Sequence, residues 1–254
     1  MWQNYRVIRN CYKYYSSIGI ASDIWGMSNN TFTDWVNNMD LIDGKTLNLS
    51  GCDLEFEKTN YSDAKYKFNP KASLIRFNFM EIIGRMASIK FMNSGLANSW
   101  SESVKMMIDH CIKKMDRPEW NSNIWRENIL WKERPDMLMK KYKHLLDNFF
   151  AKYNGAKTMP GKKKFMSLEE FKQLCSDGCL MEDESMLADR ELSTCFCLSM
   201  QTQVDEINQC RNQEMSFIEF IEAFARAADK ANLNPIHTPE GKVIFLFAKD
   251  KKSI

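Results

Sequence analysis

The chain has 254 residues, of which 44% are hydrophobic and 27% charged, and its formal net charge is +2. That apolar content is ample for one large or two smaller packed cores, and so small a net charge gives nucleic-acid binding no global electrostatic support. Seventeen methionines and sixteen phenylalanines stand out, and their default role is to fill helical cores.

The first part of the chain predicts four helices. Helical spacing of apolar residues predicts one helix over residues 2–16 and a second around Phe32, Trp35, Val36 and Met39, followed by a turn at Gly44. A short helix is expected around Ser50 to Thr59. A polar loop at Asn69-Pro70 then separates it from a long helix over Arg76 to Phe91, and Gly95 closes this region.

A tryptophan-rich segment comes next. Ser101 is a suitable N-cap for a helix that ends before Arg117-Pro118. Trp120, Trp125 and Trp131 follow, and we expect them to dock within the chain, against one or both lobes, with a partner as the alternative.

In the last part of the chain, apolar spacing predicts helices over residues 136–153 and 189–204. After Asn234-Pro235 the tail carries an apolar run with lysines on both sides: Val243, Ile244, Phe245, Leu246 and Phe247. We expect this run to anchor the tail on its own protein or on a neighbouring one.

Four stretches share one pattern, a loop ending that runs into an apolar helix. They centre on Met27-Ser28, Leu74-Ile75, Met166-Ser167 and Met215-Ser216. Met27 and Met166 are 139 residues apart, and Leu74 and Met215 are 141 apart, which indicates a duplicated two-motif unit. At the second spacing Phe79, Glu81, Arg85 and Ala87 align with Phe220, Glu222, Arg226 and Ala228.

The shared pattern resembles the exit side of an EF-hand. In that motif an apolar residue at loop position 8 makes a short backbone pairing, position 12 supplies a bidentate Glu, and a Phe opens the outgoing helix. Glu170-Phe171 and Glu219-Phe220 match the last two roles.

The four loops do not match a calcium site. The fourth, Asn208 to Glu219, has Asn208, Cys210 and Asn212 at positions 1, 3 and 5 and Gln213 in place of Gly. The third, Met159 to Glu170, carries Lys162, Lys163 and Lys164, whose charges repel a cation. The second runs from Lys67 to Asn78, and the first, Ile20 to Thr31, offers only Asp23. We therefore expect no metal and no cofactor, with one alternative, a residual weak site formed by Asn208, Asn212 and Glu219.

Cysteine and histidine spacing favours neither a zinc site nor a disulfide framework. The eight cysteines are therefore expected to be reduced and intracellular. No secretory signal and no membrane-spanning stretch is expected.

A basic run extends from Lys140 to Lys164, with eight lysines against one acid, Asp147. It fits an acidic partner, and a merely solvated face is the alternative. The predicted partner-binding residues are Lys140, Lys141, Lys143, Lys162, Lys163 and Lys164.

The phrases Phe165 to Phe171, Met200 to Asn208 and Phe217 to Ala223 are similar to those of the degenerate EF-hand proteins of ciliate and other protist axonemes. The resemblance covers about residues 20–230. It implies an all-α protein with two calmodulin-like lobes, residues 1–95 and 136–232, joined by a helical connector over 96–135 and followed by a tail over 233–254.

The resemblance also implies a function. It indicates a non-enzymatic adaptor of the ciliary axoneme, in the cytoskeleton, that binds axonemal proteins or tubulin within a larger complex. The alternative is a calcium sensor with the residual fourth-loop site. From charge and hydropathy we expect no binding to nucleic acid or membrane. An enzyme is not expected, because the sequence holds no phosphate loop, His-Glu metal motif or nucleophile elbow.

Overall fold

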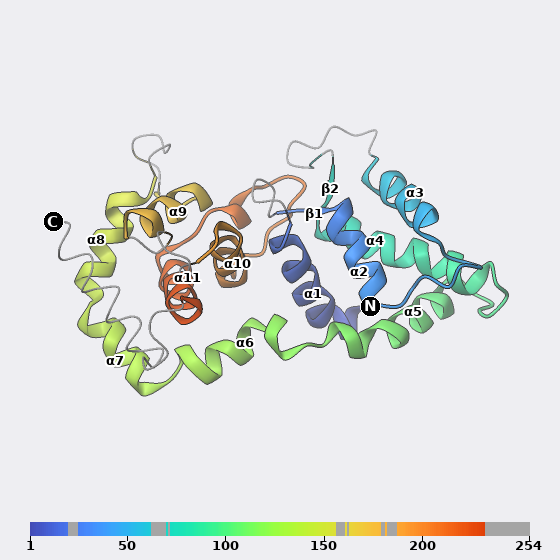
Figure 1. The fold of residues 1–254 in the computed structure, drawn as a ribbon, viewed down its shortest axis with the longest axis horizontal. Coiled ribbons are helices and arrows are strands. Elements are labelled where there is room, and N and C mark those ends of the chain that lie inside the picture. The colour runs from blue at the N-terminus through green and yellow to red at the C-terminus, as the bar shows by residue number, and fades with distance from the viewer. Residues whose placement is uncertain are drawn as a thin grey trace. The chain divides into compact units, whose positions relative to one another are not determined.

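The structure is a computed structural model, and it describes residues 1–19, 25–61, 70, 72–155, 161, 163–178, 181 and 187–231. The described chain is predominantly helical, as predicted. It forms two compact units (Figure 1). Unit 1 comprises Met1–Asn121 together with Asp205–Gln209, and unit 2 comprises Ser122–Val204 and the residues from Cys210 onward. The boundary after Asn121 lies inside the predicted connector. The predicted tail anchor, Val243 to Phe247, lies outside the described residues.

Unit 1 is built from helices that surround a short pair of strands. Its elements are η1 (Trp2–Asn4), α1 (Tyr5–Ser17), β1 (Met27–Ser28), α2 (Asn29–Asn38), α3 (Leu49–Asn60), β2 (Ser73–Leu74), α4 (Arg76–Ala87), the π-helix η2 (Ser88–Met92), α5 (Trp100–Met115) and η3 (Pro118–Trp120). Ser28 and Asn48 cap α2 and α3, because their side chains accept hydrogen bonds from the N–H groups of Thr31 and Gly51. Gly44 and Gly95, at the predicted turns, have φ values of 70° and 75°, which L-residues rarely adopt.

The strands of unit 1 pair two residues that follow different loops. β1 and β2 are antiparallel, with Met27 opposite Leu74 and Ser28 opposite Ser73. Tyr12 of α1 donates its hydroxyl to the Leu74 carbonyl oxygen, 3.2 Å away. The helices that leave the strands pack through their aromatic rings, and the ring centroids of Trp35 and Phe79 are 5.1 Å apart. The short pairing therefore fixes where α2 and α4 start relative to each other.

Unit 2 also contains a short antiparallel backbone pairing between helices. It contains α6 (Ser122–Trp125), the π-helix η4 (Arg126–Leu130), α7 (Glu133–Lys141), α8 (Lys143–Tyr153), α9 (Leu168–Asp177), α10 (Asp189–Ser199), η5 (Arg211–Gln213) and α11 (Phe217–Lys230). Met166 and Met215 form an antiparallel bridge with two backbone hydrogen bonds of 2.9 and 2.8 Å. Phe171 of α9 lies 5.8 Å from Phe196 of α10, centroid to centroid, inside the core.

Three predicted helix boundaries are wrong. α5 begins at Trp100 and is capped by Ser99, whose hydroxyl accepts from the N–H of Glu102, so Ser101 lies within its first turn. The helix predicted over 136–153 is interrupted at Tyr142, where ψ of 15° separates α7 from α8. The helix predicted over 189–204 ends at Ser199, because Met200 adopts an extended conformation.

The seven cysteines whose placement is described are free thiols, and all but Cys210 are buried. Burial raises the pKa of Cys52 to about 11 and that of Cys195 to about 12, so both stay protonated at neutral pH. They behave as small apolar core residues.

Candidate functional site

The carboxylate of Glu219 is saturated by the chain's own donors. One oxygen, Oε1, accepts from the N–H groups of Gln201 and Thr202 at 2.7 and 3.0 Å and from the Thr202 hydroxyl at 3.0 Å. The other, Oε2, accepts from the N–H and the hydroxyl of Ser216, both at 2.8 Å. Glu219 therefore joins the turn after α10 to the first turn of α11.

These hydrogen bonds favour the ionised form of Glu219. Burial alone would raise its pKa, but the donors of Ser216, Gln201 and Thr202 outweigh burial and lower the pKa below the ordinary value. The carboxylate is ionised at neutral pH, and backbone and hydroxyl dipoles balance its charge.

The other residues of the predicted residual site are not gathered into a cluster of charged ligands. Asn208 belongs to unit 1, where its amide donates to Asp205 Oδ2 over 2.6 Å, and Asn212 lies in η5 of unit 2. The side-chain oxygen Oδ1 of Asn212 is buried and accepts no hydrogen bond within the described part of the chain. Among the described residues no three His, Cys, Asp or Glu side chains come together as a metal site would require.

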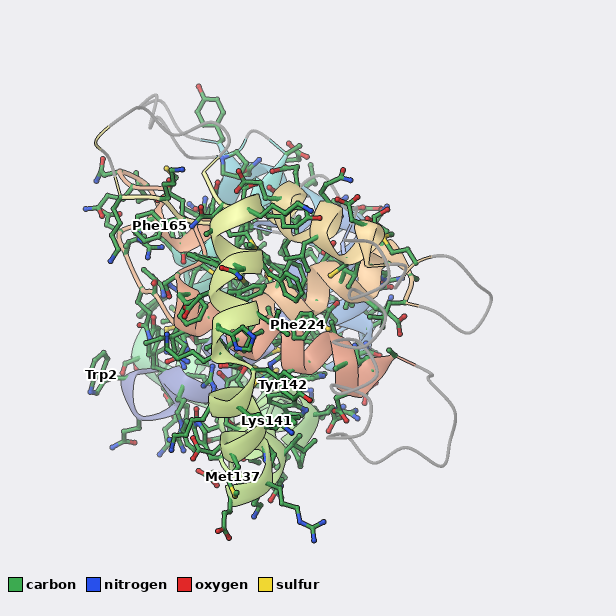
Figure 2. The ribbon with its side chains drawn as sticks, turned by 90° about the vertical axis from the view of Figure 1, so that its left-hand side faces the viewer. Trp2, Met137, Lys141, Tyr142, Phe165 and Phe224 are labelled. Carbon is green, nitrogen blue, oxygen red and sulfur yellow. The ribbon has the colours of Figure 1, made fainter. Side chains whose placement is uncertain are left out.

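The predicted basic residues fall into two groups. Lys140, Lys141 and Lys143 are exposed where α7 meets α8, while Lys163 and Lys164 are exposed just before Met166. Figure 2 shows Lys141 and Tyr142 at one end of α8, and Phe165, which follows Lys164, to the side of the other end. Lys162 lies outside the described residues.

A groove of about 580 Å³ in unit 2 borders the first of these groups. Its apolar lining includes Trp131, Met139, Phe217, Ile218 and Ile221. Three lysines also line it, Lys132, Lys140 and Lys143. Two of these apolar side chains are largely exposed, Trp131 at 61% and Ile218 at 72%. Lys143 Nζ lies 5.6 Å from the centroid of the Phe217 ring, so a cation covers the start of α11.

A groove of about 790 Å³ in unit 1 lies along α4. Tyr5, Phe77, Met80 and Trp100 contribute its apolar surface. Glu206 and Ile207 also line it. Glu206 Oε2 accepts from the N–H of Arg76 at 3.1 Å, and its other oxygen lies 3.5 Å from Arg76 Nε. A carboxylate 130 residues away in sequence therefore caps α4, whose own N-cap residue, Ile75, has no side chain able to do so.

The two grooves use equivalent positions of the duplicated helices. At the 141-residue spacing Arg76, Phe77, Met80 and Glu81 of α4 correspond to Phe217, Ile218, Ile221 and Glu222 of α11, and all eight residues line their respective grooves. Residues that correspond at this spacing thus line a groove in both units.

A buried ion cluster attaches the segment before α7 to α11. Glu222 accepts from Arg126 Nε at 2.8 Å and from Arg226 at 2.8 and 3.0 Å. Arg226 also lies over the Trp125 ring, 4.1 Å from its centroid, and Trp125 donates to Asp229 at 3.0 Å. Arg226 loses most of its hydration, and this burial lowers its pKa despite the attraction of Glu222.

The tryptophans were predicted to dock within the chain, and two of the three do. Trp120 stacks on Tyr14 of unit 1 with centroids 4.7 Å apart, and Trp125 belongs to the ion cluster of unit 2. Trp131 remains exposed beside the groove. The ion cluster itself could not be found by sequence reasoning, because Arg126 and Glu222 are 96 residues apart and form no recognisable motif.

None of the described helices is both long and apolar enough to cross a bilayer. No protein-family model, curated protein or solved structure matches this chain.

Proposed function

We propose that the protein is a non-enzymatic adaptor made of two EF-hand-like lobes, each a pair of degenerate motifs, which bind neighbouring proteins without calcium. The single observation that carries the proposal is the pairing of the four residues at loop position 8. Met27 pairs with Leu74 and Met166 with Met215, two by two, as paired EF-hands require.

Calcium independence is supported by the state of Glu219. A position-12 glutamate would give both oxygens to the ion, but here both already accept hydrogen bonds from the chain. Binding calcium would require these donors to be released at a cost in free energy. A sensor needs the opposite arrangement, in which ion binding supplies the bonds that reorganise the helices.

The adaptor role is supported by the two grooves along α4 and α11. Each is lined by apolar side chains together with charged ones of both signs, which suits binding to protein segments. For the location we propose the ciliary axoneme, on the resemblance of the sequence alone, with axonemal proteins or tubulin as partners. A fluorescently tagged chain expressed in a ciliate should label the axoneme after detergent extraction.

Isothermal titration calorimetry with calcium tests the proposal. We expect no binding heat at micromolar calcium and the same melting temperature in calcium and in chelator. Micromolar binding with a stoichiometry near one or more would contradict it.

A residual calcium sensor is the second candidate, favoured by the buried Asn212 Oδ1 that lacks a hydrogen-bond donor among the described residues. If the fourth loop does bind the ion, Glu219→Gln should abolish every calcium-dependent change. A response that survives this substitution places the ion elsewhere.

A further inference from the structure

The groove of unit 1 is lined by an acidic residue followed directly by an aliphatic one, and the groove of unit 2 has no such pair among its described lining residues. In unit 1, Glu206 and Ile207 supply a carboxylate and an aliphatic side chain beside α4. The groove of unit 2 has the equivalent helix positions, but none of the described residues that line it offers an acid followed directly by an aliphatic residue. Arg76, which holds the Glu206 carboxylate in unit 1, corresponds to Phe217 in unit 2, so a carboxylate at the unit 2 groove needs the lysines beside it as partners.

The apolar surface of the unit 2 groove is accessible. Ile218 occupies the second position of α11 and is 72% exposed, and Trp131 is 61% exposed beside it. Large apolar side chains that share one groove and remain this exposed are typical of a binding surface.

The charges at the groove favour an acidic segment. Lys140 and Lys143 each pair with an acid one turn away, Asp136 and Asp147, at 2.7 and 2.6 Å. Exposed pairs of this kind contribute little stability, so both lysines can exchange their partners for another carboxylate at low cost. The acids Glu133 and Asp136 also line the groove, against three lysines, Lys132, Lys140 and Lys143. Glu222 adds no repulsion, because Arg126 and Arg226 neutralise it.

We propose that the groove of unit 2, formed by Trp131, Lys140, Lys143, Phe217, Ile218 and Ile221, binds an extended segment of a partner protein that carries an acidic residue next to an aliphatic one. The carboxylate lies against Lys140 and Lys143, and the aliphatic side chain packs between Trp131 and Ile218. This inference rests on the proposed adaptor function and names the chemistry of its partner.

The test uses the full chain and a fluorescein-labelled peptide of residues Thr202–Gln209, which contains Asp205, Glu206 and Ile207. Fluorescence anisotropy should show saturable binding with a Kd of roughly 10–100 µM, as expected for a short flexible peptide. A Glu206→Lys peptide should bind about tenfold more weakly or worse, because it places a cation against the lysines.

The duplication supplies matched controls. Ile218→Asp in unit 2 and Phe77→Asp in unit 1 alter equivalent, exposed positions of α11 and α4. Ile218→Asp and the double variant Lys140→Glu/Lys143→Glu should each weaken peptide binding at least about tenfold, whereas Phe77→Asp should leave it unchanged. Circular dichroism melts establish that each variant is folded.

Three outcomes would overturn the proposal. The first is no saturable binding of the peptide. The second is binding that survives Ile218→Asp or that is lost in Phe77→Asp. The third is a dimer in analytical ultracentrifugation that Ile218→Asp dissociates, which would assign the groove to a second copy of this chain.

Measuring the peptide affinity in chelator and in calcium separates this proposal from the function on which it rests. Equal affinities support both. An affinity that changes with calcium refutes the calcium-independent adaptor but leaves the groove assigned, and absence of binding in both conditions refutes the groove alone.

Discussion

Glu81 and Glu222 occupy equivalent positions of the duplicated helices, yet only Glu222 is buried against two arginines. The side chain of Glu222 is 2% exposed and contacts Arg126 and Arg226, whereas that of Glu81 is 35% exposed and pairs with Arg85, itself 41% exposed. The same local motif, a Glu followed four residues later by an Arg, is thus a partly exposed pair in unit 1 and the centre of an ion cluster in unit 2.

Replacing these two glutamates should have very different effects on stability. Glu222→Ala leaves two buried guanidinium groups without their anion, and we expect unit 2 to lose about 3–5 kcal/mol of unfolding free energy. Glu81→Ala removes an exposed pair and should cost about 0–1 kcal/mol. Urea denaturation followed by circular dichroism measures both, and equal losses would show that the cluster does not stabilise unit 2.

Glu219→Gln should destabilise unit 2 even in chelator. The amide can still accept from Gln201 and Thr202, but its NH₂ group then faces the N–H and hydroxyl of Ser216. A buried donor without an acceptor costs about 1–3 kcal/mol, which thermal unfolding will detect.

Glu170→Gln is the matched control for this substitution. Glu170 holds the same loop position and accepts from the N–H of Ser167 at 2.8 Å, so its loss should resemble the loss of a helix cap, about 1 kcal/mol. If Glu170→Gln costs as much as Glu219→Gln, the ionised carboxylate of Glu219 adds nothing beyond the effect of a helix cap.

The stabilising effect of Glu219 should depend on pH. Its pKa is lowered in the folded protein, so its contribution is complete above the ordinary value of 4.5 and is lost as the pH falls through the folded value. The difference in unfolding free energy between the natural chain and Glu219→Gln should therefore shrink below about pH 4.5. Chemical denaturation from pH 7 to pH 3 measures it, and a difference that stays constant would show that the carboxylate charge is not involved.

The contribution of Glu206 to stability should change with pH in the direction opposite to that of Glu219. Burial raises its pKa even though Arg76 attracts the charged form, so its contribution is complete below 4.5 and is lost as the pH rises through the folded value. Glu206→Gln should consequently weaken the pH dependence of unit 1 without affecting unit 2. Hydrogen exchange at the amide of Arg76 reports on this contact.

Gly26→Ala should disrupt the strand pair of unit 1. A Cβ atom at Gly26 would lie 2.3 Å from Ser73 Oγ and 2.7 Å from Ser73 Cβ, and Ser73 is buried. We expect a loss of about 1–3 kcal/mol from this overpacking. Ser73→Gly removes both clashing atoms, so the double variant should be more stable than Gly26→Ala alone. Absence of this rescue in thermal melts would contradict the assigned register.

The sequence predicted the helices but not the contacts that join distant segments. Sequence pattern located α1 and α2 by apolar spacing, because a face buried in a core repeats with the helical period, and the starts of α4, α9 and α11 by the repeated loop-to-helix motif. It did not reveal the break at Tyr142, since the apolar pattern continues through α7 and α8.

The candidate site was predictable only in part. The lysines beside the unit 2 groove stood out by composition, whereas the contacts of Glu206 with Arg76 and of Arg126 with Glu222 depend on how the chain folds back on itself. Neither contact involves a motif, and the two contacts join residues 130 and 96 positions apart. Local pattern carries no information about such pairs.

The strand pairing at Met27, Met166 and Met215 has a consequence for oxidative chemistry. All three thioethers are fully shielded from solvent, and conversion to the sulfoxide would force a polar oxygen into the centre of a unit. Peroxide can reach them only when the unit opens, so the rate at which they are oxidised reports how often each unit opens. Exposed Met137 should react first and thereby provides the internal reference.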